Sequence, residues 1–257
     1  MLLAIDIGNS NIVIGGIEND QIAFEARIAT DYIKTSDQYG VEIKNILDLF
    51  SVSTCSIQDC IISSVVPPVL NSVRTGVMKV TAKEPVVVGP GITTGLNIQM
   101  DDPASVGSDL IVAAVAAAQE YDPPIILIDM GTATTISVVG HNNTYLGGAV
   151  MPGLRVSADA LTSKAALLPG IQLDKPRKAI GKNTVDAMRS GLMFGTADML
   201  DGMIQRIEEE LGEKATVIAT GGVSQFIIPL CKREMILERD LLLKGMNLIY
   251  KKNRKVR

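Results

Sequence analysis

Residues 2–14 read LLAIDIGNSNIVI, and residues 125–138 read IILIDMGTATTISV. In each segment an apolar, β-branched run leads into Asp-x-Gly, small polar residues follow, and a second β-branched run begins. This pattern predicts a strand, a tight turn and a returning strand, because glycine adopts backbone angles that other residues avoid. The repetition predicts two halves of similar topology, which we place at residues 1–117 and 118–257.

The rest of the chain alternates between strand-like and helix-like patterns. Such a sequence predicts an α/β protein with mixed sheets and a ligand cleft between its two halves. We expect further strands at 21–28, 59–65, 85–88, 144–149 and 215–219, and helices at 38–50, 68–82, 107–120, 183–211 and 240–250.

Composition excludes several classes of protein. The net charge of −4 gives no basic field for nucleic acid, and the three cysteines form no CxxC pair typical of a zinc site. The longest apolar run, residues 111–118, is far shorter than the roughly 20 residues of a membrane helix, and no secretory signal opens the chain. We therefore expect a cytoplasmic protein that binds neither nucleic acid nor membrane. The basic residues within 251–257 are typical of a solvated tail.

Asp6 carries the first hypothesis about chemistry. A carboxylate at the end of a buried strand is costly unless something binds its charge, and a Mg²⁺-bound phosphate is a candidate. Backbone N–H groups of the Gly8–Asn11 turn can bind phosphate oxygens, although an Asx turn in a simple hairpin is the alternative. The second copy, Asp129–Thr134, favours phosphate, since two hairpins can hold a nucleotide from both sides. The chain has neither a GxxxxGK[ST] loop nor a dinucleotide fingerprint.

Further motifs narrow the family. In order they are GPGITTGLNI (89–98), DDP (101–103), VGSD (106–109), DMGTAT (129–134), LGGAVMPG (146–153), IGKNTVDAM (180–188) and ATGG (219–222). Together they resemble type III pantothenate kinases, which belong to the superfamily of actin, Hsp70 and sugar kinases. The resemblance implies two actin-like, ribonuclease H-like halves with an ATP cleft between them. It also implies a homodimeric enzyme that uses ATP to phosphorylate the primary hydroxyl of pantothenate, in the first step of coenzyme A synthesis.

The same resemblance assigns roles to individual residues. Asp109 becomes the general base, although a charge that complements the helix dipole is the alternative. Asp129 becomes the site of a monovalent cation, K⁺ or NH₄⁺, unless it repeats the phosphate role of Asp6. The residues implied for Mg²⁺–ATP are Asp6, Ile7, Gly8, Asn9, Ser10, Asn11, Ile12, Val13, Thr132, Gly221 and Gly222. Those implied for the acceptor are Met100, Gly107, Ser108, Asp109 and Leu110. Thr184 is implied to contact the acceptor from the neighbouring subunit.

Two positions depart from the family pattern. The family usually has arginine where this chain has Leu110 and tyrosine where it has Met100, and both normally help to hold pantothenate. Lys182 or Arg155 are candidates to compensate. The alternatives are a diverged paralogue that acts on another small hydroxyl compound, or a non-catalytic actin-like regulator that binds ATP. The presence of Asp109 favours an enzyme, because a regulator has no use for a base directed at an acceptor.

Overall fold

The computed structural model describes residues 1–254, which form two compact units. The first unit contains residues 1–96, 101–119 and those from Asp240 onward, and the second contains 97–100 and 120–239. The units are therefore not simply the segments before and after residue 117. The C-terminal helix α7 (Leu241–Asn253) belongs to the first unit because it packs against strands of the first sheet.

The first unit is built on a five-stranded mixed sheet in the order β3-β2-β1-β4-β5. The central strand β1 is antiparallel to β2 and parallel to β4. All six residues of β1 are buried, which suits a nearly continuous apolar run in the middle of a sheet. The strands are β1 (Leu2–Ile7), β2 (Asn11–Glu18), β3 (Gln21–Ala29), β4 (Asp59–Ser64) and β5 (Val86–Val87).

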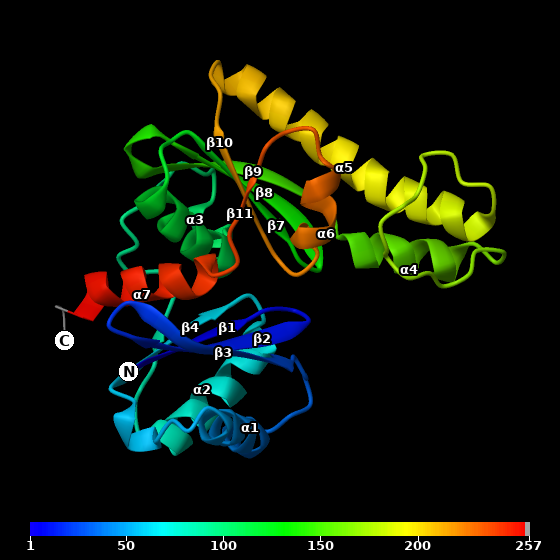
Figure 1. Cartoon of the computed structure of the whole chain (residues 1–257). Coiled ribbons are helices and arrows are strands. Elements are labelled where there is room, and N and C mark those ends of the chain that lie inside the picture. The colour runs from blue at the N-terminus through cyan, green and yellow to red at the C-terminus, as the bar shows by residue number, and fades with distance from the viewer. Residues whose placement is uncertain (255–257) are drawn as a thin grey trace. The chain divides into compact units, whose positions relative to one another are not determined.

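Helices cover both faces of this sheet (Figure 1). On one face, α1 (Ser36–Leu49) and α2 (Pro67–Thr81) pack over an apolar core that includes Ile5 and Ile62. On the other face α7 lies against β1 and β4, and it also meets α3 (Ser108–Glu120). A Cβ atom at Gly245 would lie only 1.9 Å from the carbonyl oxygen of Val112, so the backbones of α7 and α3 are in direct contact.

The second unit repeats the topology of the first. Its sheet has the order β11-β10-β7-β8-β9-β6, with β7 antiparallel to β8 and parallel to β10. Without the added edge strand β6, this is the strand order of the first sheet, so the predicted pair of similar α/β halves is confirmed. The strands are β6 (Asn97–Ile98), β7 (Ile125–Met130), β8 (Ala133–Gly140), β9 (Thr144–Pro152), β10 (Thr216–Thr220) and β11 (Ile236–Leu237).

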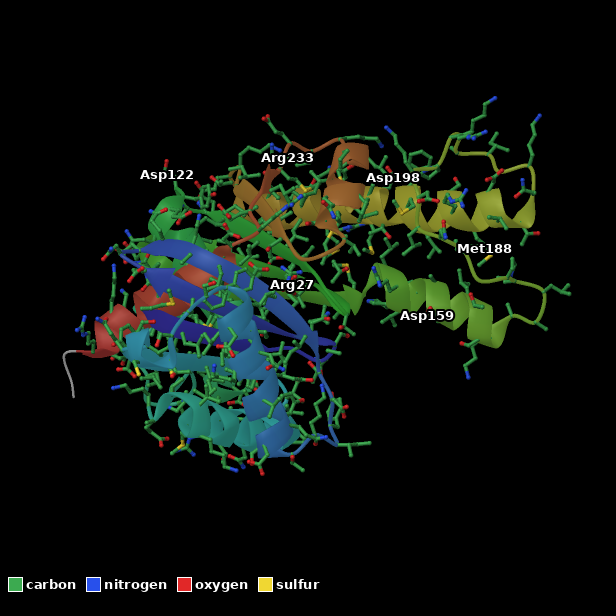
Figure 2. The ribbon with its side chains drawn as sticks, turned by 60° about the horizontal axis from the view of Figure 1, so that its bottom comes forward. Arg27, Asp122, Asp159, Met188, Asp198 and Arg233 are labelled. Carbon is green, nitrogen blue, oxygen red and sulfur yellow. The ribbon has the colours of Figure 1, made fainter. Side chains whose placement is uncertain are left out.

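Three helices pack on one face of the second sheet, over a core that includes Ile128, Leu200 and Ile204. They are α4 (Leu154–Lys164), α5 (Thr184–Leu211) and α6 (Ser224–Ile227). Asp159 on α4 and Met188 on α5 mark the part of the unit where these two helices run beside each other (Figure 2). Short 3₁₀ helices lie at Thr54–Ser56, Pro103–Ser105, His141–Asn143 and Ile228–Leu230.

Each strand and helix expected from the sequence is present, with ends shifted by a few residues. Helices α4 and α6 and the two-residue strands β6 and β11 were not among those expected. The predicted solvated tail was wrong at its start, because Lys251 and Lys252 belong to α7 and Lys251 pairs with Asp20. Residues 255–257 of that tail lie outside the described residues. Within residues 1–254 no helix is long and apolar enough to cross a membrane.

Candidate functional site

The turn between β1 and β2 presents polar groups at one edge of the first sheet. It is braced by Thr30, just after β3, whose hydroxyl donates to the Gly8 carbonyl (2.6 Å) and whose N–H donates to the Ser10 carbonyl (3.0 Å). Gly8 N–H in turn donates to the Asn11 carbonyl (3.0 Å). With its backbone fixed in this way, the turn leaves the residues Asn9, Ser10 and Asn11 exposed.

Asp6 lies directly before this turn and is only 5% exposed. Its neighbours Ile5 and Ile7 belong to the core under α1 and α2, so Asp6 points to the opposite face, because side chains alternate along a strand. Ile7 and Ile12 are fully buried in that core, which leaves only their backbone groups for a ligand. Val13 is half-buried and pairs with Asp6 across the hairpin.

The end of β4 brings a second set of residues to the same edge. Ser63 is the β4 residue paired with Asp6, and parallel strands place paired side chains on one face. Ser63 is fully buried, and its hydroxyl lies 3.1 Å from the hydroxyl of Ser108. Ser108 also bonds both backbone groups of Ser64, so the first turn of α3 is fixed beside the residue that pairs with Asp6.

Asp109 follows Ser108 in this first turn. Its carboxylate Oδ1 accepts the N–H of Leu110 (2.7 Å). Burial raises the pKa of Asp109, and the hydrogen bonds from backbone N–H groups oppose that shift only in part. A Cβ atom at Gly107 would lie 2.6 Å from Asp109 Oδ1, so a larger residue at this position would displace the carboxylate from the place it has here. Two carboxylates of the first unit, Asp6 on β1 and Asp109 on α3, are thus connected through Ser63, which pairs with Asp6 and is hydrogen-bonded to the residue before Asp109.

The second unit has a corresponding arrangement at the β7–β8 turn. Asp129 pairs with Thr220 across the parallel strands β7 and β10, and Gly131 N–H donates to the Ala133 carbonyl (3.0 Å). Gly221 has a left-handed φ of +94°, and a Cβ atom there would lie 2.6 Å from Asp129 Oδ1. Thr132 and Gly222 are exposed at the same end of this sheet.

Two further features of the second unit lie near this turn. A Cβ atom at Gly153, which precedes α4, would lie 2.2 Å from the Thr132 carbonyl oxygen. The hydroxyl of Thr134 is buried and has no hydrogen-bond partner among the described residues. Thr134 and Gly153 are the last residues of the DMGTAT and LGGAVMPG motifs, but the sequence predicted no role for either.

The remaining acceptor residues predicted in this unit lie in two places. Met100 follows β6, and its sulfur would be 3.1 Å from a Cβ atom at Gly147. Thr184 is the exposed first residue of α5, after the N-cap Asn183, whose side chain accepts the Asp186 N–H (2.9 Å). Neither contacts the other through any bond that the structure describes.

The carboxylates suit a metal ion that is shared with a ligand. Within residues 1–254 no three His, Cys, Asp or Glu side chains are grouped closely enough to hold a metal ion by themselves. Mg²⁺ in phosphate-transfer sites usually takes one or two carboxylates together with substrate phosphates and water. A single buried strand-end carboxylate such as Asp6, next to a turn with exposed polar side chains, fits that kind of site.

Comparison with known proteins decides the family. A family model described as type III pantothenate kinase matches residues 2–206. The chain belongs to this family. Two proteins named type III pantothenate kinase, from Exiguobacterium sp. and Brevibacillus brevis, are 43% and 42% identical to it, over 99% and 98% of this chain and 100% and 99% of their own lengths.

Solved structures extend the likeness at the level of the fold. Component A of the (R)-2-hydroxyglutaryl-CoA dehydratase of Acidaminococcus fermentans has a TM-score of 0.58 at 14% identity, with 98% of both chains covered. The activator of the 2-hydroxyisocaproyl-CoA dehydratase of Clostridium difficile, with bound ADPNP, has a TM-score of 0.56 at 13% identity, with 100% of this chain and 97% of that chain covered. The fold is therefore the actin-like mixed α/β fold, as the sequence predicted.

Proposed function

We propose that this protein transfers the γ-phosphate of ATP to the primary hydroxyl of pantothenate. The observation that carries the proposal is the edge of the first sheet, where Asp6 and the Gly8–Asn11 turn adjoin the segment that holds Asp109. Membership of a kinase family implies ATP with a divalent metal ion as the phosphoryl donor. The buried Asp6 supplies a fixed negative charge for that ion, and the adjoining turn supplies polar groups for phosphate oxygens.

Asp109 acts as the general base in this proposal. The acceptor oxygen forms a bond to the γ-phosphorus, its proton passes to the Asp109 carboxylate, and the bond from phosphorus to the bridging oxygen breaks to release ADP. A raised pKa makes Asp109 a better proton acceptor than an exposed aspartate. Because phosphoryl transfer is loose, most of the rate comes from positioning and charge stabilisation, so the placement of Asp109 matters more than its basicity.

The second unit offers polar groups of its own to a phosphate. Thr132, Gly221 and Gly222 are accessible or half-accessible at the end of β7 and β10, where a phosphate or adenosine group can approach the backbone. We assign a monovalent cation, K⁺ or NH₄⁺, to Asp129. Support comes from its carboxylate at a strand end, close to the backbone of Gly221, since hard cations prefer oxygen ligands.

The homodimer proposed for this chain finds support on α4. Only Leu154 and Ala158 of this helix are buried, whereas Val156 and Leu161 are exposed. Contiguous apolar patches mark protein contacts, and we propose that Val156 and Leu161 belong to such a patch at the dimer contact. In the proposed dimer, Thr184 contacts the acceptor bound by the neighbouring subunit.

A second candidate is a diverged kinase for another small hydroxyl compound. Leu110 is half-buried beside Asp109 and has neither charge nor donor, and Met100 packs against Gly147 without a hydroxyl. A carboxylate such as that of pantothenate is bound best by a guanidinium group, which neither residue provides. We expect Lys182 or Arg155 to compensate if pantothenate is the acceptor.

The test is a coupled assay of ADP release with pantothenate and related hydroxyl compounds as acceptors. Asp109→Asn and Asp6→Asn should each lower the rate by orders of magnitude, since they remove charges used in the transition state. Asp122→Asn is the matched control, because Asp122 is an exposed residue of the second unit (Figure 2) and should leave the rate unchanged. Normal turnover by a folded Asp109→Asn variant would show that Asp109 is not the base.

A further inference from the structure

The hydroxyl of Ser108 is fully used within the first unit. It donates to the Ser64 carbonyl (2.9 Å) and accepts the Ser64 N–H (3.0 Å). A hydroxyl has one hydrogen, so the bond of 3.1 Å between Ser63 and Ser108 must be donated by Ser63. Ser108 then donates once and accepts twice, which is the full capacity of a serine side chain.

Family resemblance implies that Ser108 binds the acceptor. A hydroxyl that already makes three hydrogen bonds has none left for an acceptor molecule. The side chain therefore contacts the protein and not the substrate, and any substrate contact of this residue must come from its backbone.

The position of the bonds shows what they do. We name Ser63, Ser64 and Ser108 the serine cluster. Ser63 is fully buried and pairs with Asp6 across β1 and β4, whereas Ser108 directly precedes Asp109 at the start of α3. The cluster thus connects β4, at the residue that pairs with Asp6, to the start of α3, at the residue that precedes Asp109.

We propose that Ser63 and Ser108 are positioning residues that fix Asp109 relative to Asp6. The inference rests on the proposed function, in which both carboxylates take part in one reaction. If the cluster is broken, the first turn of α3 is free to shift on the edge of the sheet. Since displacement of a reacting group by about 1 Å can cost about a hundredfold in rate, even a small shift of Asp109 should lower turnover.

The test compares three variants in the ADP-release assay. Ser108→Ala should lower kcat about tenfold and change the KM for ATP by less than about twofold, since the proton acceptor moves while the phosphate turn stays in place. Ser63→Ala should lower kcat less, because Ser64 still holds Ser108. The double variant should be no slower than Ser108→Ala, because Ser63 acts through Ser108.

Thr81→Val is the matched control in the same unit. Thr81 is also buried, and its hydroxyl donates to the Val77 carbonyl (2.8 Å) near Cys60, towards the other end of β4. This variant loses a buried hydroxyl and should lower the melting temperature as Ser108→Ala does, but it should keep the wild-type kcat. If Ser108→Ala does not fold, Ser63→Ala alone decides whether kcat falls.

Two results would overturn the inference. One is a kcat for folded Ser108→Ala within about twofold of the Thr81→Val control. The other is a raised KM for the acceptor with kcat unchanged, which would mean that the Ser108 side chain binds substrate after all.

The failure of the proposed function looks different. If Asp109→Asn is inactive and Ser108→Ala is normal, only the role of the serine cluster is refuted. If the wild type has no phosphotransferase activity, amide hydrogen exchange still tests the cluster. Residues 107–111 should then exchange faster in Ser108→Ala than in Thr81→Val, and equal exchange would refute the inference.

Discussion

Gly221 offers a prediction whose size follows from geometry. Its φ of +94° is in the left-handed region, and a Cβ atom would lie 2.6 Å from the backbone N and C atoms of Met130 and from Asp129 Oδ1. Left-handed strain costs about 1–2 kcal/mol, and overpacking against a well-ordered backbone costs about 1–3 kcal/mol. Gly221→Ala should therefore lower the free energy of unfolding by about 2–5 kcal/mol.

The adjacent glycine is a matched control. Gly222 has no atom within 4 Å of a built Cβ, so Gly222→Ala should change the free energy of unfolding by no more than about 0.5 kcal/mol. Urea denaturation of both variants, followed by circular dichroism, measures the difference. Because the new Cβ displaces Asp129 or Met130, Gly221→Ala should also weaken ATP binding, measured by calorimetry. Equal stability of the two variants would refute the reasoning.

Three further predictions concern pH, acceptor and cation. Burial alone would raise the pKa of Glu208, but Lys214, the Ala215 N–H and Arg233 (Figure 2) together lower it. Ionised Glu208 therefore stabilises the fold at pH values above its ordinary pKa of 4.5. Glu208→Gln should lower the free energy of unfolding by about 1–3 kcal/mol at pH 7, and the exposed Lys214 should account for little of that loss. The difference in unfolding free energy between variant and wild type should shrink as the pH falls below 4.5. If the chain is the diverged kinase of the second candidate function, pantothenate turnover should be poor in the native chain. Leu110→Arg with Met100→Tyr should then lower the KM for pantothenate about tenfold to a hundredfold, since hydrogen bonds to charged groups are worth about 1.5–3 kcal/mol. An efficient native enzyme with no gain from the pair would refute the divergence. Replacing Na⁺ by K⁺ at equal ionic strength should raise the rate, and an indifferent rate would count against a cation at Asp129.

Most strands and helices of this fold could be predicted from the amino-acid sequence. The two Asp-x-Gly hairpins were predictable because β-branched runs and glycine turns are local signals, and the structure has them as β1–β2 and β7–β8. Helix α4 was not predicted because apolar residues stand on both of its sides: Val156 lies opposite the buried Leu154 and Ala158, which weakens the helical periodicity. The return of α7 (Leu241–Asn253) to the first unit has no local signal either, since it depends on contacts with β1, β2 and β4, all of which end by Ser64.

The candidate site divides in the same way. Asp6, Asp109 and Asp129 stand in recognisable motifs, so their types and positions drew attention in the sequence. Ser63 did not, because a serine at the end of an apolar strand is common and its bond to Ser108 joins residues 45 positions apart. A pairing of that kind is fixed by how α3 meets the sheet, and no pattern in either segment specifies it.

The discontinuity of the first unit has a consequence for how the protein is made. Helix α7 covers a face of the sheet that carries Asp6, and its Gly245 touches the backbone of α3. A ribosome reaches residues 241–253 only after it has made all of 120–239, so the sheet formed by the first ninety or so residues must wait for its last helix. Until then Leu2, Ala4 and Ile61 lie on an uncovered apolar face, which a chaperone can bind.

The segment 120–239, by contrast, is continuous and needs only residues 97–100, which are already made. We therefore expect the half encoded second to become protease-resistant first on stalled ribosomes, and the half encoded first to follow only when residue 253 has left the exit tunnel.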